Sequence, residues 1–295
     1  MGEFAAISAA FLWALSSILF SFSGKQIGSS SLNRIRLSFA FLFLVITHTL
    51  VYGTPIPLTA TNEQWIWLGL SSIIGLVVGD LLLFQSFIMV GPRLAMLVMA
   101  IAPVISALFA WIFLGETLSF LQMGGIVLTM GGISVVILDR NNSHNPIYSD
   151  RHKWIGILLG IGAALGQAVG LIFAKKGLPP EFPALSGVVI RVLVAVISVW
   201  FFAILTKQFK KSFQQIRQFP KAFRFAFAGE MVGPFLGVWL SLIAVQFANV
   251  GIASTLMSLT PIFHLPISTI LKEMITKQAI AGTFIAMAGV AIIFF

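Results

Sequence analysis

Long apolar stretches alternate with short polar breaks along the whole chain. Each stretch has about 20 residues, enough for a helix to cross the roughly 30 Å hydrocarbon core of a bilayer. Charged residues, prolines and clusters of Gly, Asn and Ser separate the stretches. The pattern predicts about ten transmembrane helices, near residues 3–22, 32–52, 64–89, 93–114, 119–138, 154–174, 184–206, 222–247, 250–271 and 276–295.

Composition supports an all-α polytopic membrane protein whose solvent is the lipid bilayer. Hydrophobic residues make up 58% of the chain and charged residues only 9%, whereas soluble globular proteins contain about 25% charged residues. Cysteine is absent, which excludes disulfides, thiolate metal sites and a cysteine nucleophile. We expect neither a cofactor nor a metal site.

The second half of the chain repeats features of the first. A polar loop, residues 140–153, separates residues 1–139 from residues 154–295. One matched set keeps a constant offset between the halves: Ala95, Met99 and Pro103 with Ala253, Met257 and Pro261. Five spans per half is an odd number, so the second half enters the membrane from the opposite side. The sequence therefore predicts two five-helix inverted repeats, an arrangement common in transporters.

The basic residues of the chain indicate its orientation in the membrane rather than nucleic-acid binding. Lys and Arg number 18 against 9 Asp and Glu, and they lie in short loops between apolar segments. With the N-terminus outside, the outer loops carry only Lys175 and Lys176, while the 207–224 segment is cytoplasmic. The positive-inside rule thus predicts a multi-pass protein of the cell (inner) membrane with both termini outside.

Three charged residues inside predicted spans are candidates for substrate binding or coupling. Asp80 lies well inside the third span, where a charge costs about 2.5–3.5 kcal/mol; it either holds a substrate ammonium or a coupling proton, or is a structural acid. Glu230 lies in the corresponding part of the eighth span, nearer a helix end. Arg191 keeps its charge and either forms an ion pair, which we favour, or binds a substrate carboxylate. Its repeat-mate Arg36 is expected to snorkel to the headgroups.

Uncharged polar and aromatic residues at membrane depth extend this set. His264 could relay protons or bond the substrate, and Gln85 and Gln167 could read a polar substrate or join helices. Trp13 and Trp239 fall inside spans, where an indole face can hold a cation or simply fill the bundle.

Prolines and glycines predict where the helices bend and where they pack closely. Pro103 and Pro261 occupy matched positions in the fourth and ninth spans, where each removes a helix bond and favours a hinge or bend. Glycines at seven-residue spacing in the fifth and tenth spans, Gly125 with Gly132 and Gly282 with Gly289, predict close helix packing within a monomer or in a homodimer.

Several short motifs occur in the same order in both halves. The first half carries them at 77–84 (VVGDLLLF), 90–92 (VGP), 102–103 (AP), 114–118 (LGETL) and 124–125 (GG); the second at 166–168 (GQA), 191 (R), 233–237 (GPFLG), 260–261 (TP), 272–273 (KE) and 282 (G). Together they resemble the EamA-type repeat of the drug/metabolite transporter superfamily, over nearly the whole chain.

The resemblance implies a ten-helix secondary transporter. Its substrate would be a small polar metabolite such as an amino acid, an amine or an organic cation, often moved outward by alternating access. The alternatives are a lipid or polyprenyl carrier and a membrane protein without transport activity. An intramembrane enzyme is disfavoured, because the sequence has no second aspartate in a predicted span, no His-Glu-x-x-His motif and no phosphate-binding loop.

Overall fold

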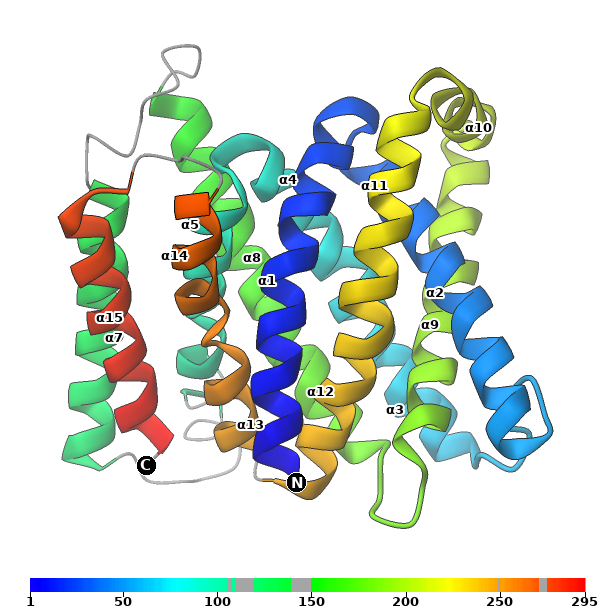
Figure 1. The fold of residues 1–295 in the computed structure, drawn as a ribbon. Helices are drawn as coiled ribbons and strands as arrows, with labels where there is room; N and C mark the ends of the chain where they lie inside the picture. Colours follow the sequence, from blue (N-terminus) through cyan, green and yellow to red (C-terminus); the bar gives the residue numbers. More distant parts are fainter. Residues whose placement is uncertain (106–107, 110–118, 139–149, 249, 271–274, 295) are drawn as a thin grey trace.

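The structure is a computed structural model, and it describes residues 1–105, 108–109, 119–138, 150–248, 250–270 and 275–294. Within these ranges the chain folds into helices without a strand. The helices lie side by side and span one thick layer (Figure 1). Helical structure satisfies every backbone group within its own segment, which is what a hydrocarbon solvent requires.

Six helical segments in the described ranges are long and apolar enough to cross a membrane. They are α1 (Gly2–Ile27), α2 (Ser29–Tyr52), the continuous α3 (Asn62–Ser72), η1 (Ile73–Gly79) and α4 (Asp80–Val90), α8 (Asp150–Lys176), α9 (Ala184–Leu205), and the continuous α11 (Pro220–Glu230), η3 (Met231–Phe235) and α12 (Leu236–Phe247). These helices confirm a polytopic α-helical membrane protein.

Shorter helices complete the bundle. They are α5 (Pro92–Met99), α7 (Phe120–Leu138), α10 (Phe209–Gln218), α13 (Val250–Met257), α14 (Thr260–Ile270) and α15 (Lys277–Phe294). The end of the predicted fourth span, residues 110–114, and residues 140–149 of the predicted loop 140–153 lie outside the described residues. The number of ten spans therefore stays a prediction.

Two connections between spans are a single glycine each. Gly28 joins α1 to α2 with a φ of 78°, and Gly91 joins α4 to α5 with a φ of 82°. Positive φ values strain side-chain-bearing residues, so glycine is favoured at both positions. Pro92 then opens α5, where its fixed φ suits the first helical turn.

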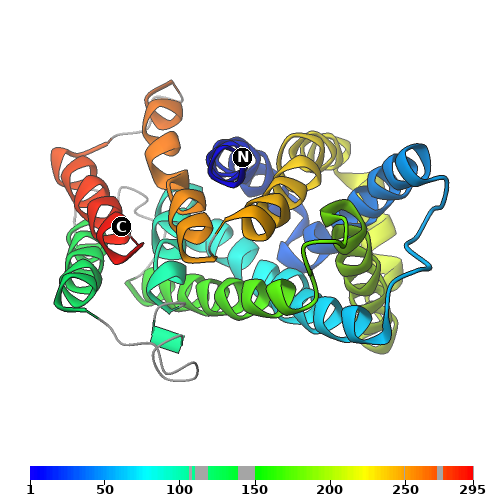
Figure 2. The ribbon, with the colours of Figure 1, turned by 90° about the horizontal axis from the view of Figure 1, so that it is seen from below.

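The two halves of the chain pack into each other. The first helix of the chain, α1, lies against α11, η3 and α12, whereas α8 lies against α3, η1 and α4. Seen from below, α8 runs along the cyan α3 to α4 segment and α1 lies beside the golden α12 (Figure 2). The second spans, α2 and α9, also pack together, as do α7 and α15. Each of these contacts joins one half to the other.

Glycines allow α8 and η1 to meet backbone against backbone. A Cβ atom built on Gly166 would lie 3.1 Å from Gly79 Cα, and one built on Gly170 would lie 3.3 Å from Gly75 Cα. Small residues permit such close approaches between membrane helices. These two contacts, which we call the glycine seam, bring span three close to the middle of α8.

The same device joins α7 to α15, which stand together at one side of the bundle (Figure 1). A Cβ atom on Gly132 would lie 2.3 Å from Ala286 N, and one on Gly289 would lie 2.4 Å from Thr129 N. The predicted packing of small residues in the fifth and tenth spans is therefore formed within one chain. Gly131, next to Gly132, has no atom of the described residues within 4 Å of a Cβ atom built on it.

We expect Gly132→Ala to lower stability and Gly131→Ala to leave it unchanged or slightly higher. The first substitution forces α7 and α15 apart, and overpacking of this kind costs about 1–3 kcal/mol. The second adds a methyl group where nothing is displaced. Thermal unfolding of the purified variants in detergent would check this, and equal midpoints for the two variants would contradict the packing described.

Candidate functional site

A central cavity of about 90 Å³ has walls from both halves of the chain. This volume has room for several waters or a small polar group, since one water needs about 10–15 Å³. Residues of α1, α2, η1, α4, α5, α8, α9, η3 and α12 line it. Its polar and charged lining consists of Ser16, Ser17, Arg36, Asp80, Gln167, Arg191 and Ser241.

Arg36 is the centre of a buried charge cluster. Only 2% of its side chain is exposed; one terminal nitrogen pairs with Asp80 Oδ2, and the other lies 3.9 Å from Glu230 Oε2. Arg36 Nε donates to Asn33 Oδ1 at 3.1 Å, and the guanidinium carbon lies 5.0 Å from the centre of the Phe84 ring. The prediction that Arg36 snorkels to the headgroups is therefore wrong: two acids and an amide draw its charge inward.

Asn33 connects this cluster to the backbone of the third span. Its Nδ2 donates to the carbonyls of Leu76 at 3.1 Å and Val77 at 3.3 Å. Both carbonyls belong to the π-helical segment η1. Segments of π-helix are rare and frequently occur at functional sites. Asp80 follows η1 directly. The segment η1 therefore accepts the hydrogen bonds of Asn33 and also positions the carboxylate that pairs with Arg36.

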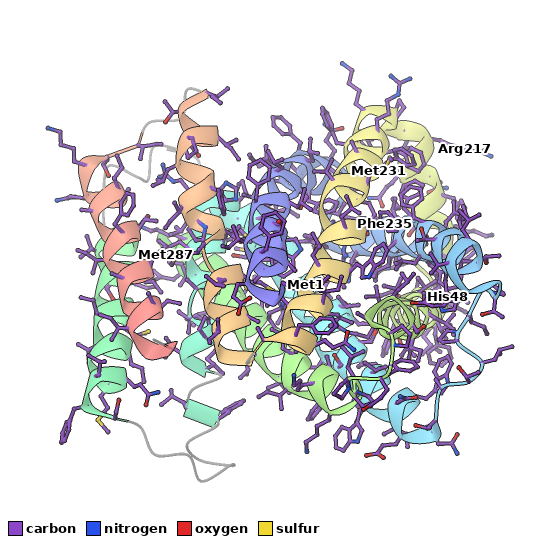
Figure 3. The ribbon with its side chains drawn as sticks, turned by 60° about the horizontal axis from the view of Figure 1, so that its bottom comes forward. Met1, His48, Arg217, Met231, Phe235 and Met287 are labelled. Atoms are coloured by element: carbon purple, nitrogen blue, oxygen red, sulfur yellow. The ribbon has the colours of Figure 1, made fainter. Side chains whose placement is uncertain are left out.

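The two acids differ in their access to the cavity. Asp80 begins α4 and its side chain is 18% exposed, whereas Glu230 ends α11 and is completely buried. Glu230 is followed at once by the second π-helical segment, η3, whose ends Met231 and Phe235 are marked in Figure 3. Each acid thus stands at one end of a π-helical segment, in the third and the eighth predicted spans.

Arg191 faces the cavity without a close acid. It is buried in α9, and no carboxylate of the described chain lies within 4 Å of its guanidinium. A Cβ atom on Gly75 would lie only 3.5 Å from Arg191 Nη2, so the glycine leaves room for this side chain. Asp80 pairs with Arg36 at close range and interacts with Arg191 electrostatically from farther away. Arg191 Nε has no hydrogen-bond partner in the described chain.

A smaller second cavity of about 40 Å³ adjoins the first. Trp13, Met96, Met99 and Gln167 line both cavities. The remaining wall of the second cavity is largely apolar. All the charged lining residues thus belong to the first cavity, and none lines the second.

The remaining predicted residues lie at different distances from the cavity. His264 Nε2 lies 2.8 Å from Oγ of Ser17, so it supports the cavity wall without lining it. Gln85 instead accepts a hydrogen bond at 2.8 Å from Ser29, beside the connection between α1 and α2. Trp239 packs on an apolar cluster to which α9 contributes more of the buried residues than any other helix. The structure therefore does not bring Gln85 or Trp239 to the site.

The fourth and ninth spans break at matched positions. Helix α5 ends at Met99 and helix α13 at Met257, in each case four residues before a proline, Pro103 and Pro261. Proline has no N–H for the carbonyl four residues earlier, and its ring collides with that carbonyl. The chain turns tightly there, with Ala100 N donating to Leu97 O at 3.0 Å. Both methionines line the second cavity.

Sequence reasoning missed Asn33 and the true role of Arg36. Their three-residue spacing places both on one face of a helix, inside a span that also contains Ser29–Ser31 and Arg34. This cluster of polar residues was the available signal. Among the described residues no group of three or more His, Asp or Glu residues could hold a metal ion.

Comparisons with known proteins agree with this architecture. The sequence model of the EamA-like transporter family matches residues 1–138 and 154–295. The uncharacterized transporter YvbV of Bacillus subtilis (strain 168) is 30% identical over 74 residues, which span 25% of this chain and 22% of that relative. A crystal structure of another protein superposes with a TM-score of 0.66, covering 99% of this chain and 96% of that chain at 16% identity, which shows a shared fold.

The buried ion pair predicts a non-additive pair of substitutions. Arg36→Gln leaves two buried acids without a cation, and breaking a buried pair in this way costs about 3–5 kcal/mol. We expect the double variant Arg36→Gln/Asp80→Asn to regain much of the lost stability, because it removes both charges. Thermal unfolding midpoints of the two variants and the wild type would show this; a double variant less stable than Arg36→Gln would contradict the pairing.

Proposed function

This chain belongs to the EamA-like transporter family. We propose that it is a secondary transporter that moves a small polar metabolite, such as an amino acid, an amine or an organic cation, out of the cell. The observation that carries the proposal is the central cavity. It draws its walls from both halves of the chain and exposes an acid, Asp80, together with a guanidinium, Arg191. Buried charges within membrane helices typically mark substrate or ion pathways.

The lining suggests how a substrate binds. Asp80 would hold the ammonium group of the substrate, because it is the acid of the cluster with an exposed surface. Arg191, which has no carboxylate within ion-pair distance in the described chain, would take a carboxylate where the substrate has one. Gln167 supplies an uncharged hydrogen-bonding group, and Trp13 with Met99 would contact the apolar part.

Alternating access would follow from the two halves. We take residues 1–139 and 154–295 as inverted repeats, since α1 and α8 each pack on the third span of the opposite half. The breaks after Met99 and Met257 would act as hinges, because helix continuity is already lost at both. Rocking of one repeat against the other would then expose the cavity to each side in turn.

Uptake into proteoliposomes tests the transport function. A panel of labelled amino acids, amines and organic cations would be offered with and without a proton gradient. We expect saturable uptake of at least one class, and Asp80→Asn should reduce it at least tenfold because the ammonium loses its counter-charge. A folded protein that carries no panel member would favour a lipid or polyprenyl substrate instead.

Two further variants separate binding from motion in the same assay. Pro261→Ala restores a helix bond at the break after Met257 and should slow uptake while leaving binding unchanged. Gln85→Ala is the matched control, since Gln85 lies outside the cavity. Equal loss of transport in Gln85→Ala and Asp80→Asn would argue against the proposed site.

We also propose that both termini lie outside the cell membrane. Helix α1 begins and α15 ends on one face of the bundle, opposite α10 (Figure 1). Basic residues gather on the α10 side, including Lys207, Lys210, Lys211 and Arg217, as the positive-inside rule expects for a cytoplasmic face.

Single cysteines would check this orientation, since the natural chain has none. In intact cells an impermeant maleimide should label Glu181→Cys, in the exposed connection between α8 and α9, and should spare Lys210→Cys on α10. Labelling of Lys210→Cys alone would reverse the orientation.

A further inference from the structure

Glu230 is a buried acid that the proposed substrate site does not use. Its side chain has no exposed surface, and neither carboxylate oxygen has a hydrogen-bond partner in the described chain. Its closest cation, Arg36 Nη1, stands 3.9 Å from Oε2. A carboxylate without hydrogen bonds is costly to bury, and such groups usually take up a proton and become neutral.

The surroundings of Glu230 explain why it lacks partners. Arg36, from α2, directs its donors to Asp80 and Asn33 rather than to Glu230. Asp80, from α4, is the other charged group near Glu230. The charged residues of α1, Glu3 and Lys25, lie in its first and last turns, away from this level.

Close packing fixes the backbone around Glu230. A Cβ atom on Gly229 would lie 2.9 Å from the Phe20 ring, and one on Gly233 would lie 2.1 Å from Ser16 Oγ. These two glycines hold α11 and η3 tightly against α1. The acid therefore has little freedom to move toward Arg36, and a change in their pairing depends on the longer arginine side chain.

We propose that Glu230 is the binding site of the coupling proton and that Arg36 is a counter-charge shared between Glu230 and Asp80. This inference rests on the proposed transport function. Without substrate, ionised Asp80 holds Arg36 and Glu230 keeps its proton. When a substrate cation binds Asp80, Arg36 turns to Glu230, which loses its proton. Glu230 does not line the cavity, so the proton leaves past Arg36, which lines the cavity and lies 3.9 Å from the acid.

Charge balance supports this exchange. Before binding, Asp80 carries one negative charge, Arg36 one positive charge and Glu230 none. After binding, the substrate ammonium balances Asp80, and Arg36 balances ionised Glu230. Arg191, which lines the same cavity, adds one positive charge in both states. The net charge of the site therefore does not change when the substrate binds, which a low-dielectric site favours. One cation enters as one proton leaves, so the coupling is an exchange of substrate cation for proton.

The movement required of Arg36 is small. A charge-assisted N–H···O bond has a length of about 2.7–2.9 Å, and Arg36 Nη1 already lies 3.9 Å from Glu230 Oε2. Rotation of the side chain closes this gap without a change in the backbone of α2. Asn33 holds Arg36 Nε throughout and acts as the pivot.

Infrared difference spectroscopy tests this site without any substrate. The full-length protein in lipid vesicles should show the C=O stretching band of a protonated carboxylic acid at neutral pH, and Glu230→Gln should remove it. Asp80→Asn should also remove it at the same pH, because Arg36 then pairs with Glu230, which ionises. Asp80→Glu is the matched control: it retains an acid at this position and should keep the band.

Each outcome decides one part of the proposal. A wild-type spectrum without a band sensitive to Glu230→Gln would overturn the proton site. A band that persists in folded Asp80→Asn would overturn the shared role of Arg36. Because the readout needs no transport, a correct spectral pattern with no uptake of any panel member would instead reject the proposed function and leave the proton site standing.

A transport readout then links the site to coupling. For any panel member accumulated by the wild type, Glu230→Gln should lose the stimulation by a proton gradient and keep exchange of labelled for unlabelled substrate. Retained stimulation by the gradient would overturn the coupling role of Glu230.

Discussion

The burial of the Arg36 charge is the constraint on which the middle of this protein depends. A guanidinium does not lose its proton in a protein, so its charge needs compensation wherever it lies. Asn33 and Asp80 provide that compensation from α2 and α4, and the Phe84 ring covers the remaining face. Since Asn33 also bonds the backbone of η1, the position of the third span depends on the same cluster.

The two π-helical segments give the site its asymmetry. Both halves place such a segment in the third span of the half, yet Asp80 follows η1 whereas Glu230 precedes η3. The first acid therefore reaches the cavity and the second is enclosed by α1. The two similar halves thus place two carboxyl groups in different surroundings, one at the cavity and one buried. This difference allows the two acids to have different functions.

Hydropathy alone predicted the helices, because a bilayer demands long apolar segments and leaves few alternatives. The breaks near Pro103 and Pro261 also followed from local chemistry. The side of each helix on which a polar side chain lies could not be predicted in this way. The predicted second span begins at residue 32, four residues before Arg36, but α2 begins at Ser29 after a one-residue connection. Arg36 therefore lies about two turns inside the helix. Gln85 and Trp239 were assigned to the site from depth alone, and depth does not determine which side of a helix a residue occupies.

The glycine seam between η1 and α8 has a mechanical consequence. Side chains that interdigitate between two helices resist a shift of one helix along the other, because each must first leave the gap between its neighbours. Gly75, Gly79, Gly166 and Gly170 have no side chains that could interdigitate in this way. The register of the two helices at the seam depends instead on a polar contact, the hydrogen bond of 2.6 Å that Ser71 Oγ donates to Gly170 O.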